Sequence, residues 1–101
     1  KQCDAQIMKL SEVDQSVTVL SGNRVLSGIT FTPQYKGNLT ERIKGMVAER
    51  VKTVAPSVQV ATVTTNADTV SQIAALKEKQ QNGADIKTEF EAIEKTLASG
   101  Q

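Results

Sequence analysis

The sequence contains no histidine and no tryptophan, and Cys3 is its single cysteine. Histidine is the usual general base near neutral pH and the commonest metal ligand, so its absence argues against most hydrolytic and transition-metal sites. No nucleophile stands in a pattern with a base, and no metal-ligand cluster is present. We therefore predict a protein that is not an enzyme, with no catalytic, metal-binding or cofactor-binding residue and no cofactor.

The single cysteine cannot form a disulfide within the chain, and its neighbours do not favour thiol chemistry. Gln2 is not the small residue that a bacterial lipobox needs before its cysteine, and Asp4 has the wrong charge to stabilise a thiolate. No apolar run of about 18 residues could span a membrane, and no signal peptide is present. We expect any export signal or lipid anchor to lie outside this chain.

Aromatic residues are scarce, and charge is balanced at 12 Lys+Arg against 11 Asp+Glu. The three aromatics are Phe31, Tyr35 and Phe90. A nucleic-acid surface needs a basic face and usually aromatic rings on which bases stack, so we predict no nucleic-acid binding. The 101 residues suffice for one modest, aliphatic core. We assign residues 1–12 to an N-terminal arm or short helix and residues 13–101 to a single domain.

A hairpin is predicted first. Residues 17–20 and 24–32 have the alternation of strands, and Ser21-Gly22-Asn23 between them has the composition of a tight turn. Gly28 in the middle of the second strand indicates a bulge or a close helix crossing. A helix over residues 39–54 follows, with Asn38 and Glu41 as a capping pair. Its Gly45 is expected to pack closely against the sheet.

Pro56 ends this helix, and residues 57–65 form the third strand. Val58, Val60 and Thr62 are expected on one face of that strand, with Ala61 and Val63 on the other. One core is predicted to contain residues of all these elements: Val17, Val19, Val25, Ile29, Val47, Val51 and Val60.

Two short helices are predicted at the end of the chain. Asn66 caps the first, Asn82-Gly83 stops it, and Asp85 caps the second. In the first helix, the residues expected on one face are Val70, Ile73, Ala74 and Lys77. Lys77 is expected at the edge of that face, with its charged end reaching water. In the second, the apolar stripe is Ile86, Phe90, Ile93 and Leu97. This stripe is read as core, and the alternative is a face for an envelope protein partner or a homo-oligomer.

The predicted fold is α+β, with a small three-stranded sheet, one helix after the hairpin and two C-terminal helices. The acidic residues of the last helix, Asp85, Glu89, Glu91 and Glu94, alternate with Lys87 and Lys95 and are read as a solvated face. Asn66-Ala67-Asp68 is read as a helix cap rather than an anion site.

Five stretches in order resemble a known family. They are residues 17–32, Ala48-Glu49-Arg50-Val51-Lys52, Ala55-Pro56-Ser57-Val58, Thr65-Asn66-Ala67-Asp68, and Asn82-Gly83 before Glu89-Phe90. The chain is similar to the sporulation lipoprotein family named for YhcN and YlaJ. The resemblance implies a non-enzymatic, exported protein of the spore envelope or inner spore membrane. It implies membrane association through a lipid anchor outside this chain and a role in spore formation or germination.

The order helix, hairpin, helix, strand is also similar to the small BON-type and ring-building modules of envelope proteins. Those modules bind lipid surfaces or assemble side by side. The alternative function is therefore a lipid- or peptidoglycan-associated binding or assembly module, to which the two trailing helices are additions.

Overall fold

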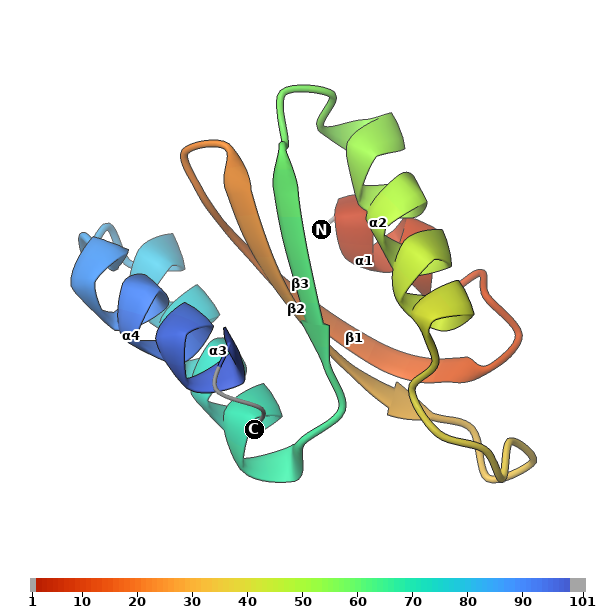
Figure 1. The fold of residues 1–101 in the computed structure, drawn as a ribbon. Coiled ribbons are helices and arrows are strands. Elements are labelled where there is room, and N and C mark those ends of the chain that lie inside the picture. The colour runs from red at the N-terminus through yellow and green to blue at the C-terminus, as the bar shows by residue number, and fades with distance from the viewer. Residues whose placement is uncertain (1, 99–101) are drawn as a thin grey trace.

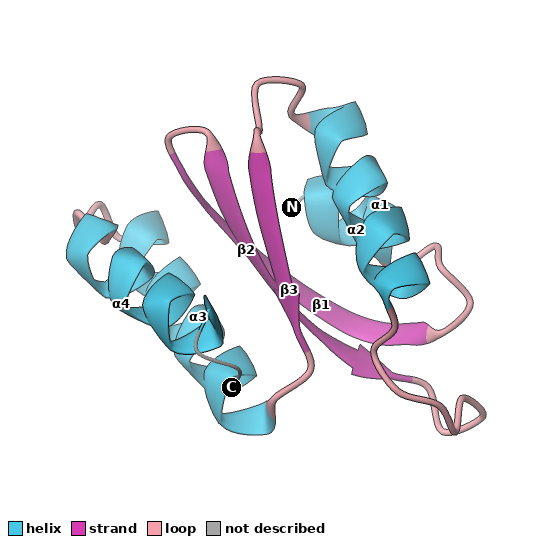
Figure 2. Ribbon diagram, viewed as in Figure 1, coloured by secondary structure: helices cyan, strands magenta, loops and turns pink. Residues whose placement is uncertain are grey.

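The chain forms a three-stranded sheet between two layers of helices, as a computed structural model describing residues 2–98 shows (Figures 1 and 2). The elements are α1 (Gln2–Ile7), β1 (Val13–Ser21), β2 (Arg24–Phe31), α2 (Glu41–Val54), β3 (Val60–Thr64), α3 (Ala67–Gln81) and α4 (Lys87–Ala98). Helices α1 and α2 cover one face of the sheet, and α3 and α4 cover the other.

The sheet is mixed, with the strand order β1-β2-β3. Strands β1 and β2 are antiparallel and meet at a turn in which Gly22 has a φ of 61°, a value that glycine adopts without steric cost. Strands β2 and β3 are parallel, which requires the crossover that α2 provides. The predicted α+β class, with a helix after the hairpin and two C-terminal helices, is confirmed.

Two separate cores replace the single core predicted from the sequence. Val25, Ile29, Val47 and Val51 pack together under α1 and α2. Val19, with Val17 beside it, packs instead under α3 and α4. Val60 is only partly buried and belongs to neither cluster. The sequence prediction was wrong because both faces of the sheet are covered. Alternation separates the residues of a strand onto opposite faces but does not say which of the two cores each face joins.

The start of α2 differs from the prediction. Thr40, not Asn38, is the N-cap, and its hydroxyl accepts a hydrogen bond of 3.2 Å from the amide of Ile43. The main-chain carbonyl of Asn38 instead accepts a hydrogen bond from the Tyr35 hydroxyl, a contact within the loop that precedes the helix. Gly45 is exposed, with no atom within 4 Å of where its Cβ would be, so the expected close packing against the sheet was wrong.

Gly28 does mark a close helix crossing. A Cβ at this position would lie 2.9 Å from Cγ2 of Val70 in α3 and 3.2 Å from its Cα. The entry into β3 is less regular than predicted. Val58 lies before the strand and packs in the α1/α2 core together with Val63, rather than on the face of Val60.

The ends of α3 and α4 follow the predicted signals. Asn66 caps α3 by accepting from the amide of Thr69, and Gly83 follows the helix with a φ of 90°. The Asp85 carboxylate accepts from the amide of Lys87 at the start of α4. Of the residues predicted in register on α3, Ile73 is buried, Val70 and Lys77 are partly buried and Ala74 is exposed. Thr69 and Leu76, which were not predicted, complete the buried face.

Candidate binding surface along strand β3

The two edges of the sheet differ in how well they are protected. At the β1 edge, Asp14 is exposed and the strand has a bulge between Val13 and Gln15. Charges and bulges on an edge discourage pairing with another strand. The β3 edge has neither, since Val60–Thr64 (VATVT) contains no charge, proline or glycine. The outer edge of β3 is therefore open to another strand.

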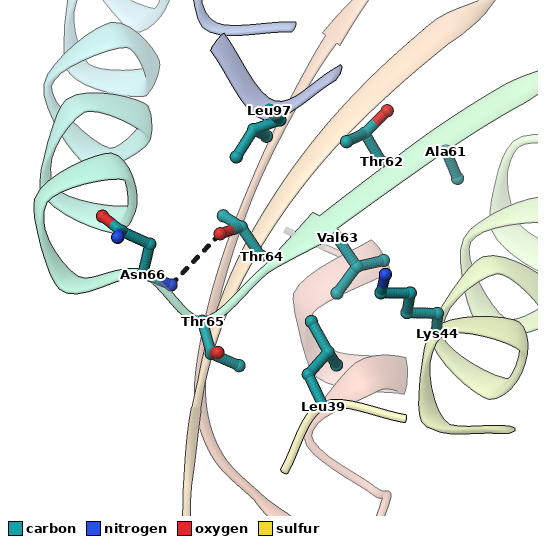
Figure 3. A pocket seen from close by; sticks show the side chains of 9 residues that line it. All are labelled: Leu39, Lys44, Ala61, Thr62, Val63, Thr64, Thr65, Asn66 and Leu97. Atoms are coloured by element: carbon teal, nitrogen blue, oxygen red, sulfur yellow. Dashed lines mark hydrogen bonds between the residues drawn. The ribbon is translucent and has the colours of Figure 1, made fainter. Parts of the chain in front are cut away.

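A hollow of about 560 Å³ lies along this edge (Figure 3). Its floor is β3 and the residues that follow it, Ala61, Thr62, Val63, Thr64, Thr65 and Asn66. Leu39 and Lys44 line it on the α2 side, and Leu97 lines it on the α4 side. In Figure 1 the edge of β3 faces the viewer between the two helix layers. The site is thus a groove with one strand at its base and a helix on each flank.

Most of the polar side chains around the groove already have partners. The Thr64 hydroxyl accepts a hydrogen bond of 3.1 Å from the main-chain N–H of Asn66, drawn in Figure 3. The Asn66 side-chain oxygen accepts from the Thr69 amide and hydroxyl, and Lys44 lies 3.4 Å from the Glu41 carboxylate. An edge strand also presents main-chain N–H and C=O groups outward. The groove therefore offers backbone hydrogen bonding more than specific side-chain chemistry.

The apolar stripe singled out in the sequence is mostly core. Ile86, Phe90 and Ile93 are buried against the sheet and α3, with Phe90 only 1% exposed. Leu97 is partly buried and is the one member that lines the β3 groove. A partner-facing role for all four residues remains a proposal, and it requires α4 to open at Gly83.

A closed polar cluster lies at the other edge of the sheet, under α1. Asp4 is 6% exposed, and its Oδ1 accepts hydrogen bonds of 2.7 Å from the hydroxyls of Ser16 and Thr18. Its Oδ2 accepts from the Lys77 ammonium of α3 at 2.6 Å. Because Thr18 donates its proton to Asp4, the buried Ser27 hydroxyl, 3.1 Å away, donates to Thr18. The cluster joins the two helix layers past the β1 edge.

Cys3, next to Asp4, is buried in the α1/α2 core. Burial raises the pKa of the Cys3 thiol, which disfavours the reactive thiolate. Among residues 2–98, no group of three or more His, Cys, Asp or Glu side chains is placed to hold a metal ion. Over the same residues, none of the helices combines the length and the apolar character needed to cross a bilayer.

The acidic residues of α4 are only partly a solvated face. Glu94 forms an ion pair of 2.7 Å with Arg24 at the start of β2, and its side chain is 13% exposed. Glu89 lies 2.9 Å from Lys79 of α3, above a smaller, mainly apolar hollow of about 310 Å³ between the two helices. These pairs hold α4 against its neighbours.

Sequence reasoning missed the groove and the Asp4–Lys77 pair. The pair joins residues 73 positions apart, and no local pattern links them. Carboxylates are almost never fully buried unless paired, but the sequence does not show that Asp4 is buried. The uncharged composition of β3, by contrast, was a local signal for an open edge.

The comparison with known proteins agrees with the resemblance seen in the sequence. A family model described as sporulation lipoprotein YhcN/YlaJ matches residues 2–98. No curated protein matches the chain. The family's description names no enzymatic activity, and a lipoprotein family implies attachment to a membrane through a lipid. Because the match covers nearly all of the sequence, the chain belongs to the YhcN/YlaJ family of sporulation lipoproteins.

Proposed function

We propose that this chain is the non-enzymatic, folded domain of a lipid-anchored protein of the spore envelope or inner spore membrane, with a role in spore formation or germination. The observation that carries the proposal is the family match over residues 2–98. The lipid is attached outside this chain, and the domain acts by binding another envelope component.

The geometry supports binding rather than chemistry. Within the described part of the chain, the thiol is buried and the Asp4 carboxylate is engaged by three donors inside the protein. Neither residue lines the β3 groove or the hollow between α3 and α4. A hollow of about 560 Å³ lies along the open β3 edge, where an added strand could form main-chain hydrogen bonds. The β3 edge is therefore the proposed working surface.

A second candidate function is a BON-like module that binds a lipid surface or peptidoglycan. The observation in its favour is the order α1, β1, β2, α2, β3, the order by which the sequence resembled those modules. Sedimentation of the purified domain with anionic lipid vesicles or with peptidoglycan sacculi tests this candidate. Stoichiometric co-sedimentation favours it, and a domain that stays in the supernatant in both assays contradicts it.

Deletion of the gene, and its replacement on the chromosome by point variants, test the main proposal. Deletion is expected to lower the yield of heat-resistant spores or the rate of germination. Thr62→Lys, which places a charge on the β3 edge, is expected to behave like the deletion. Thr53→Lys is the matched control, because Thr53 is an exposed threonine on α2 that does not line the groove. Normal spores from the deletion strain would contradict the proposal.

A further inference from the structure

We propose that the β3 edge pairs with the β3 edge of a second copy of this chain, forming a two-fold symmetric dimer. The strands run antiparallel about Thr62, and two three-stranded sheets join into one continuous sheet of six strands. This inference rests on the proposed function, because it takes the β3 edge as the working surface and names its partner.

Antiparallel pairing about Thr62 makes β3 complementary to itself. Thr62 lies opposite Thr62 of the second copy, Ala61 lies opposite Val63, and Val60 lies opposite Thr64. Opposed threonines and opposed small or β-branched residues are favourable cross-strand neighbours. No like charges face each other along the strand, because β3 contains none.

The charges of α2 are complementary in the same arrangement. Strands β2 and β3 are parallel, so the crossover helix α2 runs opposite to β3. A two-fold axis through Thr62 therefore sets the α2 helices of the two copies antiparallel along the joined sheet. The acidic first turn of α2 contains Glu41, and its basic last turn contains Lys52. Each Glu41 then approaches Lys52 of the second copy, and the two helix dipoles oppose each other.

The rims of the groove also fit this occupant. Leu39 and Leu97 are partly buried hydrophobic residues on opposite flanks of β3. A second copy seated on the edge covers both residues and excludes water from the new backbone hydrogen bonds. Ala48 adds little bulk between α2 and its counterpart, and the neighbouring Gly45 has open space beside it.

The solution mass of the purified domain tests the dimer. Light scattering over a dilution series is expected to give twice the 10.9 kDa chain mass at high concentration. Thr62→Lys opposes two ammonium groups at the axis and is expected to give the monomer mass with an unchanged thermal melt. Thr53→Lys, on α2 outside the groove, is expected to remain a dimer. A monomeric wild type at every concentration overturns the proposal, as does a dimer that survives Thr62→Lys.

A cross-link tests the register independently of dimer strength. Residues opposed across an antiparallel pair have Cα atoms about 4.5–5.5 Å apart, within the range that a disulfide spans. Thr62→Cys is therefore expected to form a covalent dimer under mild oxidation, whereas Thr53→Cys and the buried Cys3 are not. Equal cross-linking of both variants overturns the proposed register. If the purified domain is monomeric but the Thr62→Lys strain still shows the spore defect of the deletion strain, the dimer is refuted. The β3 edge then remains the proposed working surface.

Discussion

At the scale of single residues, the Asp4–Lys77 ion pair is the contact that most clearly joins the two helix layers. The side chain of Asp4 is 9% exposed and that of Lys77 is 22% exposed. Removing one partner of a buried pair leaves an uncompensated charge. We predict that Lys77→Met lowers the free energy of unfolding by about 3 kcal/mol, the low end of the range for buried pairs. Urea unfolding followed by circular dichroism measures this.

The matched control is Lys79→Met on the same helix. Lys79 pairs with Glu89, but both side chains are about half exposed, so the loss is expected to stay below about 1 kcal/mol. Equal losses for the two variants would show that Asp4 does not depend on Lys77.

Two glycines are predicted to respond in opposite directions to the same substitution. Gly28→Ala places a Cβ against the stiff Val70 side chain and its backbone, so it is expected to destabilise the fold by about 1–3 kcal/mol. Gly45→Ala meets open space on an exposed helix surface, so it is expected to stabilise by about 0.5–1 kcal/mol. Thermal melts of the two variants check this, and shifts of the same sign would refute the assigned positions.

The sequence indicates some of these residue-scale features and not others. The close helix crossing at Gly28 and the helix cap at Asn66 could each be predicted from the local sequence, and the structure agrees with both. Gly45 was misjudged, because a glycine within a helix does not indicate whether packing or solvent surrounds it. The Asp4–Lys77 pair depends on how α1 and α3 meet at the β1 edge, which the sequence pattern does not encode.

At the scale of elements, α4 depends on its apolar stripe, because an isolated 12-residue helix is marginal in water. Phe90 is 1% exposed between the sheet and α3. Phe90→Ala is expected to cost about 3–5 kcal/mol, whereas Glu91→Ala on the exposed side is expected to change stability by less than about 0.5 kcal/mol. An unchanged melt for Phe90→Ala, with a change in solution mass, would show instead that the stripe is an interface.

The ion pair between Arg42 of α2 and Glu12, just before β1, is predicted to contribute to stability in a pH-dependent way. A hydrogen bond from its own backbone amide, and then one from Arg42, hold the pKa of Glu12 below its ordinary value of 4.5. A lowered folded pKa contributes stability that is complete above the ordinary value and is lost as pH falls through the lowered one. Melts of wild type and Glu12→Gln should therefore differ at neutral pH and converge in acid.

Glu49→Gln controls for the loss of one negative charge, because Glu49 is an exposed residue of α2 itself. A difference between wild type and Glu12→Gln that stays constant down to acid pH would show that the Glu12 carboxylate gains nothing from Arg42.

Element identities followed from the sequence better than element boundaries. Periodicity located the hairpin, the crossover helix and both C-terminal helices, since each has a regular apolar pattern. The start of α2 was misplaced because Asn38 and Thr40 are both good caps. The Tyr35–Asn38 hydrogen bond, a contact within the preceding loop, settles the start in favour of Thr40.

At the scale of the whole molecule, the structure is a three-layer sandwich with one protected and one open sheet edge (Figure 1). The single core predicted from the sequence was wrong because the C-terminal helices cover the second face, which takes Val17 and Val19 away from Val25. The β3 groove was not predicted, since it exists only where α2, β3 and α4 meet. The family resemblance, by contrast, rested on local motifs and is confirmed.

We propose that this domain is held at a spore membrane by a lipid attached outside the chain. Fatty-acid labelling of the full-length gene product in sporulating cells, followed by fractionation, tests it most directly. We predict a labelled protein in the spore membrane fraction, and we predict that Cys3→Ala keeps the label because Cys3 is buried in the core. An unlabelled protein in the soluble fraction, or a label lost with Cys3→Ala, would contradict the account.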